Sequence, residues 1–261
     1  MRTYSNIQVE ITKGVATIWL NRPDVHNAIS IELIDELTHC FTDLEKNGSI
    51  RVIVLRGKGK SFSAGADLKL MLQTSRMGYE NNLEDGLKWA NCLAAIYASS
   101  KPVVGIATGN VFGGGNGLLA ACDMVIAEEN AVFSFSEVKL GIAPSTILPY
   151  ILKRINQSTA KYLMFTGIRF TAQEAYDFNF IDFTVYQQQL ESLLESILTD
   201  INSASPQGIR EIKNLISKLG AITNAEDIAN ITASSIATLK TSDEAKEGIT
   251  AFLEKRKPNW G

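Results

Sequence analysis

Apolar and polar residues alternate near the start of the chain, where Ile7, Val9 and Ile11 are separated by polar side chains. A period of two is typical of a strand with one buried face, so this segment predicts a half-buried strand. A turn at 13–14 and a second strand over 15–20 follow, which together predict a β-hairpin.

The spacing changes to a helical period after a break at residues 21–24. Ser30 is a suitable N-cap, and 47–48 is an Asn-Gly pair that ends the pattern. The apolar positions between them are three or four residues apart, as on one face of a helix. They are Ile31, Ile34, Leu37, Phe41 and Leu44.

A buried-strand pattern then recurs three times. The runs 52–55 and 102–106 are short, apolar and rich in β-branched residues, as in strands buried on both faces. A glycine-bearing loop and a predicted helix follow each run, with helices at 85–98 and 118–121. A weaker third cycle extends from 124 to 144. This recurrence predicts an α/β core built from stacked, similar turns.

The strand signal fades beyond about residue 188. A Thr171–Glu174 capping box marks one more helix start in the core. Four helices are predicted after it, at 188–203, 206–218, 224–238 and 242–256. We therefore expect a core over 1–190 and a helical region over 191–261, and the apolar faces of that region are suited to packing against another subunit.

Composition narrows the classes of function. The 261 residues carry a net charge of −3 and are 45% hydrophobic, which suits one large domain with an appendage and gives no basic excess for nucleic acid. No apolar run is long enough for a membrane span, and residues 1–14 do not resemble a secretory signal, so we expect a cytoplasmic protein. Three cysteines without metal spacing and only two histidines predict reduced thiols and no metal site.

Three consecutive glycines, at 113–115, lie between an apolar strand and an apolar helical run. Glycines in such a loop allow backbone N–H groups to approach a ligand closely. Neither a dinucleotide fingerprint nor a P-loop fits, because position 118 is Leu and no Gly-Lys-Ser/Thr follows. The loop fits an oxyanion or phosphate site, and it fits equally a close helix–strand contact that only glycine permits.

A second loop of small residues, 63–68, also follows a buried strand. Its small side chains leave the Ala66 N–H accessible, so the two loops are able to direct two donors at one carbonyl oxygen. The alternative for this loop is a tight turn capped by Asp67.

Glu137 follows Phe133 and Phe135 at a spacing of two. If the segment is a strand, the three side chains share an apolar face, where the pKa of an unpaired carboxylate rises. A group of that kind is suited to proton transfer. The alternative is a carboxylate that faces solvent or pairs with Lys139.

Taken together and in order, these pieces resemble the crotonase (enoyl-CoA hydratase/isomerase) superfamily over nearly the whole chain. The matching segments are 21–23 with 26–28, 62–68, 113–115, 121–123, 133–137, 140–141 and 251–257. The resemblance implies a crotonase-like spiral of ββα turns with a C-terminal helical trimerisation region, assembled as a homotrimer or a dimer of trimers.

The resemblance also implies roles for individual residues. The Ala66 and Gly114 amides would hold the thioester oxygen, and Glu137 would transfer the proton. Residues expected along the coenzyme A path are His26, Ala28, Ala64, Asp67 and Leu68, with Phe252 and Lys255 contributed from the tail, in some members across a subunit boundary. Coenzyme A enters as part of the substrate, so no separate cofactor is expected.

One position departs from the pattern. Hydratases with two glutamates carry the first of them two residues after the third glycine, where this chain has Gly117. A single Glu137 would then perform both proton transfers. Gly117 is also expected to leave free volume beside the acyl chain, which would admit a branched or carboxylated substrate.

The segments 113–123, 136–144 and 149–150 look most like bacterial methylglutaconyl-CoA hydratases, which act in leucine or acyclic terpenoid breakdown. Similar chains are dehydratases in polyketide β-branching and act on acyl groups attached to a carrier protein. The leading hypothesis is therefore hydration of a short or branched 2-enoyl-CoA. The alternatives are a Δ3,Δ2-enoyl-CoA isomerase and a non-catalytic subunit that binds acyl-CoA or an acyl carrier.

Overall fold

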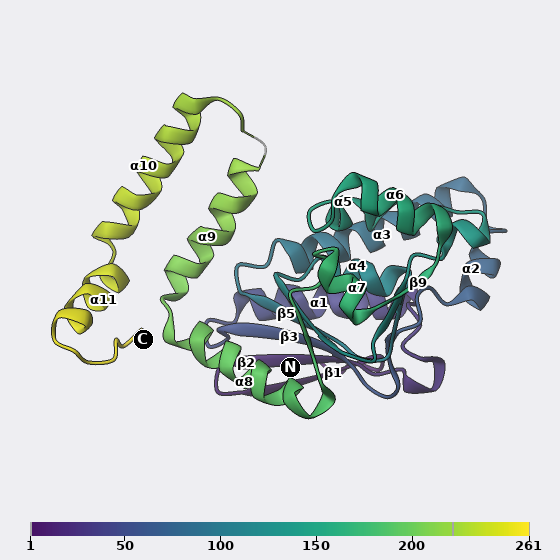
Figure 1. The fold of residues 1–261 in the computed structure, drawn as a ribbon, viewed down its shortest axis with the longest axis horizontal. Helices are drawn as coiled ribbons and strands as arrows, with labels where there is room; N and C mark the ends of the chain where they lie inside the picture. Colours follow the sequence, from purple (N-terminus) through teal and green to yellow (C-terminus); the bar gives the residue numbers. More distant parts are fainter. Residues whose placement is uncertain (1, 221, 261) are drawn as a thin grey trace.

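Two β-sheets form the framework of the core in the computed structural model, which describes residues 2–220 and 222–260 (Figure 1). The larger sheet has the strand order β1-β2-β3-β5-β7-β10, and the smaller has the order β4-β6-β8-β9. The larger sheet consists of β1 Ile7–Thr12, β2 Val15–Leu20, β3 Val52–Gly57, β5 Val103–Ala107, β7 Met124–Glu128 and β10 Phe183–Val185. The smaller sheet consists of β4 Ser61–Ser63, β6 Asn110–Phe112, β8 Val132–Ser134 and β9 Arg169–Thr171.

The chain alternates between the two sheets as it advances. The pairs β3/β4, β5/β6 and β7/β8 each place one strand in the larger sheet and the next in the smaller. Successive turns pair in parallel within both sheets, and only β1–β2 and β8–β9 are antiparallel. This arrangement is the predicted spiral of ββα turns, so the predicted fold class is confirmed.

The predicted hairpin and first helix form as their patterns require. Lys13 and Gly14 both have positive φ, as a tight hairpin turn demands, and Ala16, Ile18 and Leu20 on β2 are fully buried. The Ser30 hydroxyl caps α1 (Ile31–Lys46) by accepting a hydrogen bond from the Leu33 N–H.

Further helices cover the core. Helix α3 begins at Tyr79, six residues before the predicted start, and packs against α1. The predicted capping box forms at α7, with Thr171 and Glu174 bonded reciprocally. The helical elements of the core are η1 Pro23–Val25, α1, α2 Leu68–Thr74, α3 Tyr79–Tyr97, α4 Gly114–Ala120, η2 Glu137–Leu140, α5 Leu148–Ile151, α6 Gln157–Thr166 and α7 Ala172–Asp177.

Helix α8 (Gln187–Ser203) lies on the far face of the larger sheet. Its Leu190 and Leu194 side chains are buried against Val52, Val104 and Ile126. The boundary expected at residue 190 therefore lies inside a helix that packs on the core.

Three helices project from the core as an arm (Figure 1). They are α9 Pro206–Leu219, α10 Ala225–Thr241 and α11 Asp243–Leu253, close to the predicted bounds. Ser235 and Ala251 are the only buried side chains among the described residues of these helices. Ile216, Phe252 and Leu253 are strongly exposed. The arm thus leaves much of its apolar surface uncovered within one subunit.

Two expectations about composition are tested by the structure. Cys40, Cys92 and Cys122 are free and buried, as predicted for reduced thiols, and burial raises the pKa of each to about 12. No helix in the described part of the chain combines the length and hydropathy that crossing a bilayer requires.

Candidate active site

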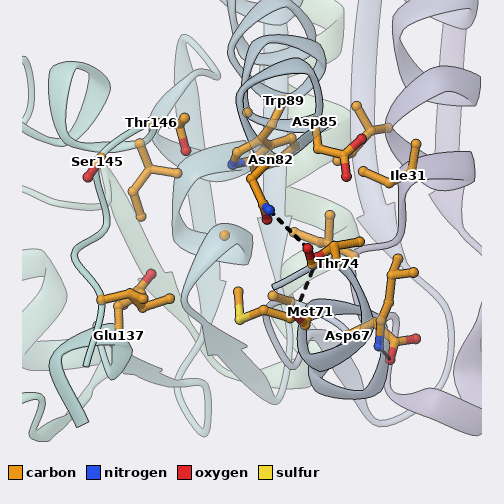
Figure 2. A pocket seen from close by; sticks show the side chains of 18 of the residues that line it. Ile31, Asp67, Met71, Thr74, Asn82, Asp85, Trp89, Glu137, Ser145 and Thr146 are labelled. Atoms are coloured by element: carbon orange, nitrogen blue, oxygen red, sulfur yellow. Dashed lines mark hydrogen bonds between the residues drawn. The ribbon is translucent and has the colours of Figure 1, made fainter. Parts of the chain in front are cut away.

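A cavity of about 280 Å³ opens between helices α2 and α3 on one side and the 142–147 loop on the other. Ala66, Gly114 and Glu137 all line it. Figure 2 shows Glu137 on the wall opposite Asp67 and Asp85, with Trp89 and Met71 between them. The three residues predicted to carry the chemistry therefore share one pocket.

The Ala66 amide is left free by the way its neighbours are bonded. Ala66 forms a parallel bridge with Ile29, in which the Ile29 N–H donates to the Gly65 carbonyl at 2.8 Å and the Asp67 N–H donates to the Ile29 carbonyl at 3.0 Å. Because peptide groups alternate in direction along an extended segment, the Ala66 N–H faces away from Ile29. It donates to no acceptor within the described residues.

The Gly114 amide lies at the end of the second loop. Gly113 has a φ of +49°, which a residue with a side chain rarely adopts, and its N–H donates to the Ser134 carbonyl at 3.0 Å. This conformation turns the chain from β6 into α4. The next N–H, that of Gly114, has no acceptor among the described residues.

The two loops touch through their glycines. A Cβ atom at Gly65 would lie 3.0 Å from the Phe112 carbonyl oxygen, and one at Gly113 would lie 3.7 Å from the Gly65 Cα atom. Close approach of the Phe112 carbonyl and a positive φ favour glycine at 65, whereas at 113 the positive φ does so. The contact brings together the two loops that carry Ala66 and Gly114, both of which line the pocket.

Glu137 begins the 3₁₀-helix η2, and the predicted strand that would have carried it ends at Ser134. The strand interpretation of Glu137 was therefore wrong. Ser136 has a ψ of 4°, and the Lys139 N–H donates to the Ser136 carbonyl, so the extended backbone stops there. Phe133 and Phe135 are nevertheless buried, which explains the alternation in the sequence.

The Glu137 carboxylate is partly withdrawn from solvent and unpaired. Its Oε2 atom is buried and accepts no hydrogen bond within the described residues, and Lys139 does not pair with it. Burial raises the pKa of Glu137, and this effect outweighs the opposing hydrogen bond from the residue's own backbone N–H. A Cβ atom at Gly113 would lie 3.2 Å from Oε1, so the carboxylate contacts the amide loop directly.

The free volume expected beside Gly117 is absent. A Cβ atom at Gly117 would lie 2.2 Å from the Cγ2 atom of Ile147, whose side chain is buried and lines the pocket. Ile147 therefore fills the space in which a second carboxylate would lie. The expectation overlooked this, because residue 147 is distant in sequence and belongs to a loop without a periodic pattern.

Two of the residues predicted along the coenzyme A path, His26 and Ala64, lie outside the lining of the cavity. His26 is exposed, its Nδ1 atom lies 3.2 Å from the Ser61 hydroxyl, and its carbonyl accepts the Ala64 N–H at 2.9 Å. Ala64 is exposed as well. These two residues border the loop that presents Ala66.

Ala28 and Leu68 also lie outside this lining, and Ala28 is buried, whereas Asp67 lines the cavity. Asp67 caps α2 and lies 3.5 Å from the Arg22 guanidinium, which also donates to the Ala28 carbonyl. The alternative of a turn capped by Asp67 is thus replaced by a helix cap. Leu68 is the first residue of α2 and is 56% exposed.

Phe252 and Lys255 lie far from this pocket within one subunit. Phe252 is on α11, at the end of the molecule opposite α2 in Figure 1, and is 83% exposed. The chain does not bring the tail residues to its own pocket, so their contact with coenzyme A stays a prediction for an assembly.

Several lining residues were not assigned to the site from the sequence, and Trp89 was expected only to pack within its helix. Asp85 and Trp89 line the pocket from α3, one helical turn apart (Figure 2), and Ile147 lines it from the 142–147 loop. The spacing of four between Asp85 and Trp89 was visible in the sequence. The cavity that both side chains line could not be inferred from the sequence.

Known proteins resemble this chain in both sequence and fold. Residues 10–261 match the family model described as "Enoyl-CoA hydratase/isomerase". The crotonyl-CoA hydratase of Syntrophomonas wolfei is 31% identical, with 98% of each chain covered. The mevalonyl-coenzyme A hydratase of Aspergillus fumigatus is 30% identical over 95% of this chain and 92% of that protein. The crystal structure of an enoyl-CoA hydratase from Shewanella pealeana superposes with a TM-score of 0.95 at 34% identity, covering 98% of this chain and 96% of the other.

Proposed function

Because the chain belongs to the enoyl-CoA hydratase/isomerase (crotonase) family, we propose that it hydrates a short or branched 2-enoyl-CoA at this pocket. The observation that supports the proposal best is that two free backbone amides and one unpaired, partly buried carboxylate line the same cavity. In this proposal the Ala66 and Gly114 amides bind the thioester oxygen, and Glu137 is the acid–base group.

The proposed reaction uses Glu137 twice. The Glu137 carboxylate accepts a proton from water while the water oxygen bonds to C3, and the electrons of the C2–C3 double bond move to the thioester oxygen. The Ala66 and Gly114 N–H groups donate to the resulting enolate oxygen. Protonated Glu137 then returns its proton to C2, which restores the carboxylate and completes the addition of one water.

The environment of Glu137 suits both steps. A raised pKa brings the acid and base forms closer in free energy near neutral pH, which favours efficient transfer in each direction. Preorganised backbone donors act without rearrangement, and loss of one such donor typically lowers a rate by about 10²–10³-fold. Gly117 provides no second carboxylate, so the proposal assigns both transfers to one residue.

The coenzyme A part of the substrate is assigned to the 64–68 loop and its neighbours. We place coenzyme A along His26, Ala28, Ala64, Asp67 and Leu68, beside the loop that carries the Ala66 amide. Relatives named as crotonyl-CoA and mevalonyl-coenzyme A hydratases support thioesters with short or branched acyl groups. The sequence resemblance names methylglutaconyl-CoA, an intermediate of leucine breakdown, as a branched candidate. It differs from the other candidates in carrying a free carboxylate on its acyl group.

The arm supports a proposal about assembly. Much of the apolar surface of α9 and α11 is uncovered, including Ile212, Ile216 and Ile249. A homotrimer, or a dimer of trimers, would bury these faces. In such an assembly Phe252 and Lys255 would reach the coenzyme A path of a neighbouring subunit.

The function is tested by following the conjugated enoyl absorbance of crotonyl-CoA and identifying the product by mass. We expect a loss of absorbance together with the gain of one water. Glu137→Gln keeps the shape of the side chain and should lower kcat by about 10²–10⁴-fold, the usual contribution of general acid–base catalysis. Glu195→Gln, at an exposed position on α8, is the matched control and should leave kcat unchanged. Full activity of a folded Glu137→Gln variant would falsify the proposed role.

Isomerisation is the second candidate function, favoured by the missing carboxylate at Gly117. A single glutamate is sufficient to move a proton between C4 and C2 of a 3-enoyl-CoA. Mass spectrometry would then show that a 3-enoyl-CoA is converted to a product of unchanged mass. A subunit that only binds acyl-CoA or an acyl carrier would bind every thioester tightly and convert none.

A further inference from the structure

The α3 wall of the cavity carries a carboxylate for which the proposed reaction has no role. Asp85 lines the pocket and is half-buried, and it forms no hydrogen bond or salt bridge within the described residues. The nearby Lys88 pairs instead with Glu84 at 3.1 Å. In Figure 2 Asp85 lies beside Ile31, across the cavity from Glu137. Asp85 therefore offers the ligand space a carboxylate that accepts no hydrogen bond from the described residues.

The charged side chains that line the cavity are all acidic. Glu137, Asp67 and Asp85 line the cavity, and the described lining includes no Lys, Arg or His. Asp67 has Arg22 at 3.5 Å, and Lys88 acts electrostatically on Asp85 from outside the lining, but Glu137 has no cation beside it among the described residues. A further carboxylate placed between two unpaired carboxylates would be desolvated and repelled, because unpaired like charges in a site of low polarity are costly.

The position of Asp85 along the ligand follows from the proposed function, on which this inference rests. The thioester oxygen is assigned to the Ala66 and Gly114 amides, and coenzyme A is assigned to the loop at 64–68. The α3 wall lies on the remaining side, next to Ile34 and Trp89, which are apolar. The acyl chain would therefore pass along Trp89 and end at Asp85.

We propose that Asp85 determines substrate specificity, and that the natural acyl group is uncharged and carries a hydroxyl at its far end, which donates to Asp85. A carboxylate acceptor with no protein donor is satisfied by a ligand that brings an O–H group. A hydroxyl costs less to desolvate than an ammonium group, and Lys88 already acts on the Asp85 charge, so a neutral donor is favoured. The same arrangement disfavours a dicarboxylic acyl group such as that of methylglutaconyl-CoA.

The experiment compares three thioesters of similar length that differ at the chain end. They are 5-hydroxy-3-methylpent-2-enoyl-CoA, 3-methylhex-2-enoyl-CoA and 3-methylglutaconyl-CoA, with crotonyl-CoA as the reference for basal hydration. For the wild-type protein we expect kcat/KM to be highest for the hydroxylated thioester. The apolar and carboxylated thioesters should each be lower by about 10- to 100-fold, the range for a charge-assisted hydrogen bond.

Two variants at position 85 distinguish the effect of the hydrogen-bond acceptor from the effect of the negative charge. Asp85→Leu should lower kcat/KM for the hydroxylated thioester by about 10- to 100-fold and leave the apolar one unchanged. Asp85→Asn keeps an oxygen acceptor and removes the charge, so it should lower activity on the hydroxylated thioester less than Asp85→Leu does and raise activity on the carboxylated one. Unchanged preferences in both folded variants, or a wild-type protein that prefers methylglutaconyl-CoA, would overturn the inference.

Failure of the inference and failure of the proposed function give different results. If crotonyl-CoA is hydrated but the three chain ends are not distinguished, only the inference fails. If no enoyl thioester is hydrated, the proposed function fails, and calorimetric binding of the three saturated thioesters then tests Asp85 alone. Equal affinities in that measurement would contradict the role assigned to Asp85, and a hydroxyl preference lost in Asp85→Leu would support it.

Discussion

Gly117 and Ile147 compete for one space, since a Cβ atom at position 117 would lie 2.2 Å from the Ile147 Cγ2 atom. A second carboxylate cannot be introduced at 117 unless this isoleucine is made smaller. The packing of the pocket thus excludes a glutamate at 117, because Ile147 of the 142–147 loop occupies the space that its side chain would need.

The first prediction concerns this pair. Gly117→Glu alone should destabilise the protein by at least about 1–3 kcal/mol through overpacking. Ile147→Ala alone should lose about 2–5 kcal/mol through the cavity it leaves. The double variant should be more stable than the sum of the two losses predicts, because each change relieves the other. Urea unfolding measures the cycle, and strict additivity would show that the two positions do not share space.

The second prediction concerns pH. The pKa of Glu137 is raised by burial, and the proposed mechanism requires its deprotonated form to accept the proton of water. The value of kcat/KM should therefore fall as pH decreases through this raised pKa, at a pH above the ordinary glutamate value of 4.5. The fall should be tenfold per pH unit below that pKa, as expected for one essential base. Glu137→Gln should remove this limb from its residual activity, and a limb that persists there would belong to another group.

The third prediction concerns Asn116. Its buried side-chain amide donates to the Ser134 carbonyl at 2.8 Å, and the same carbonyl accepts the Gly113 N–H at 3.0 Å. These two bonds hold the Gly114 amide at a fixed position relative to β8 and Glu137. Asn116→Ala should therefore lower kcat by about tenfold, in line with partial loss of a preorganised donor, with KM nearly unchanged.

Stability provides the control for that substitution. Asn116→Ala removes a buried hydrogen bond, worth about 1 kcal/mol, but it also removes the Oδ1 atom, which is buried without a donor among the described residues. Only a small loss of stability is thus expected. Asn116→Asp should be considerably less stable, because it places a carboxylate against the Ser134 carbonyl. An unchanged kcat in folded Asn116→Ala would refute a positioning role.

The fourth prediction concerns the arm. If Phe252 reaches a neighbouring subunit's coenzyme A path, Phe252→Ala should raise KM for acyl-CoA about tenfold, since a large buried aromatic contact at an interface is worth more than about 1 kcal/mol. Phe165→Ala, which alters another strongly exposed aromatic residue, on α6 of the core, should leave KM unchanged. Sedimentation velocity gives the oligomeric state, and a fully active monomer would contradict both the assembly and the role of Phe252.

The sequence predicted best where a local pattern and the tertiary environment agree. The buried runs at β3 and β5, the Ser30 cap of α1 and the Thr171–Glu174 capping box all appear as expected. The strand predicted to extend to Glu137 failed, since the alternation of Phe133 and Phe135 continues past the point where the backbone turns. Burial of those rings, and not strand geometry, produces the pattern.

Within the pocket, the two loops of small residues were visible in the sequence because glycine has few other uses after a buried strand. Their mutual contact, at Gly65 and Gly113, was not visible, since it joins segments nearly 50 residues apart. The filling of the Gly117 space by Ile147 depends likewise on a distant segment. Such properties arise from the packing of the spiral and have no local signal.

The bridge between Ile29 and Ala66 has a consequence for how activity responds to changes elsewhere. The peptide groups that flank Ala66 are bonded to Ile29, which immediately precedes the Ser30 cap of α1. The direction of the donor proposed to hold the thioester oxygen is thereby linked to the position of a 16-residue helix. Substitutions that loosen the start of α1 should accordingly impair turnover at temperatures well below global unfolding, although they touch no ligand.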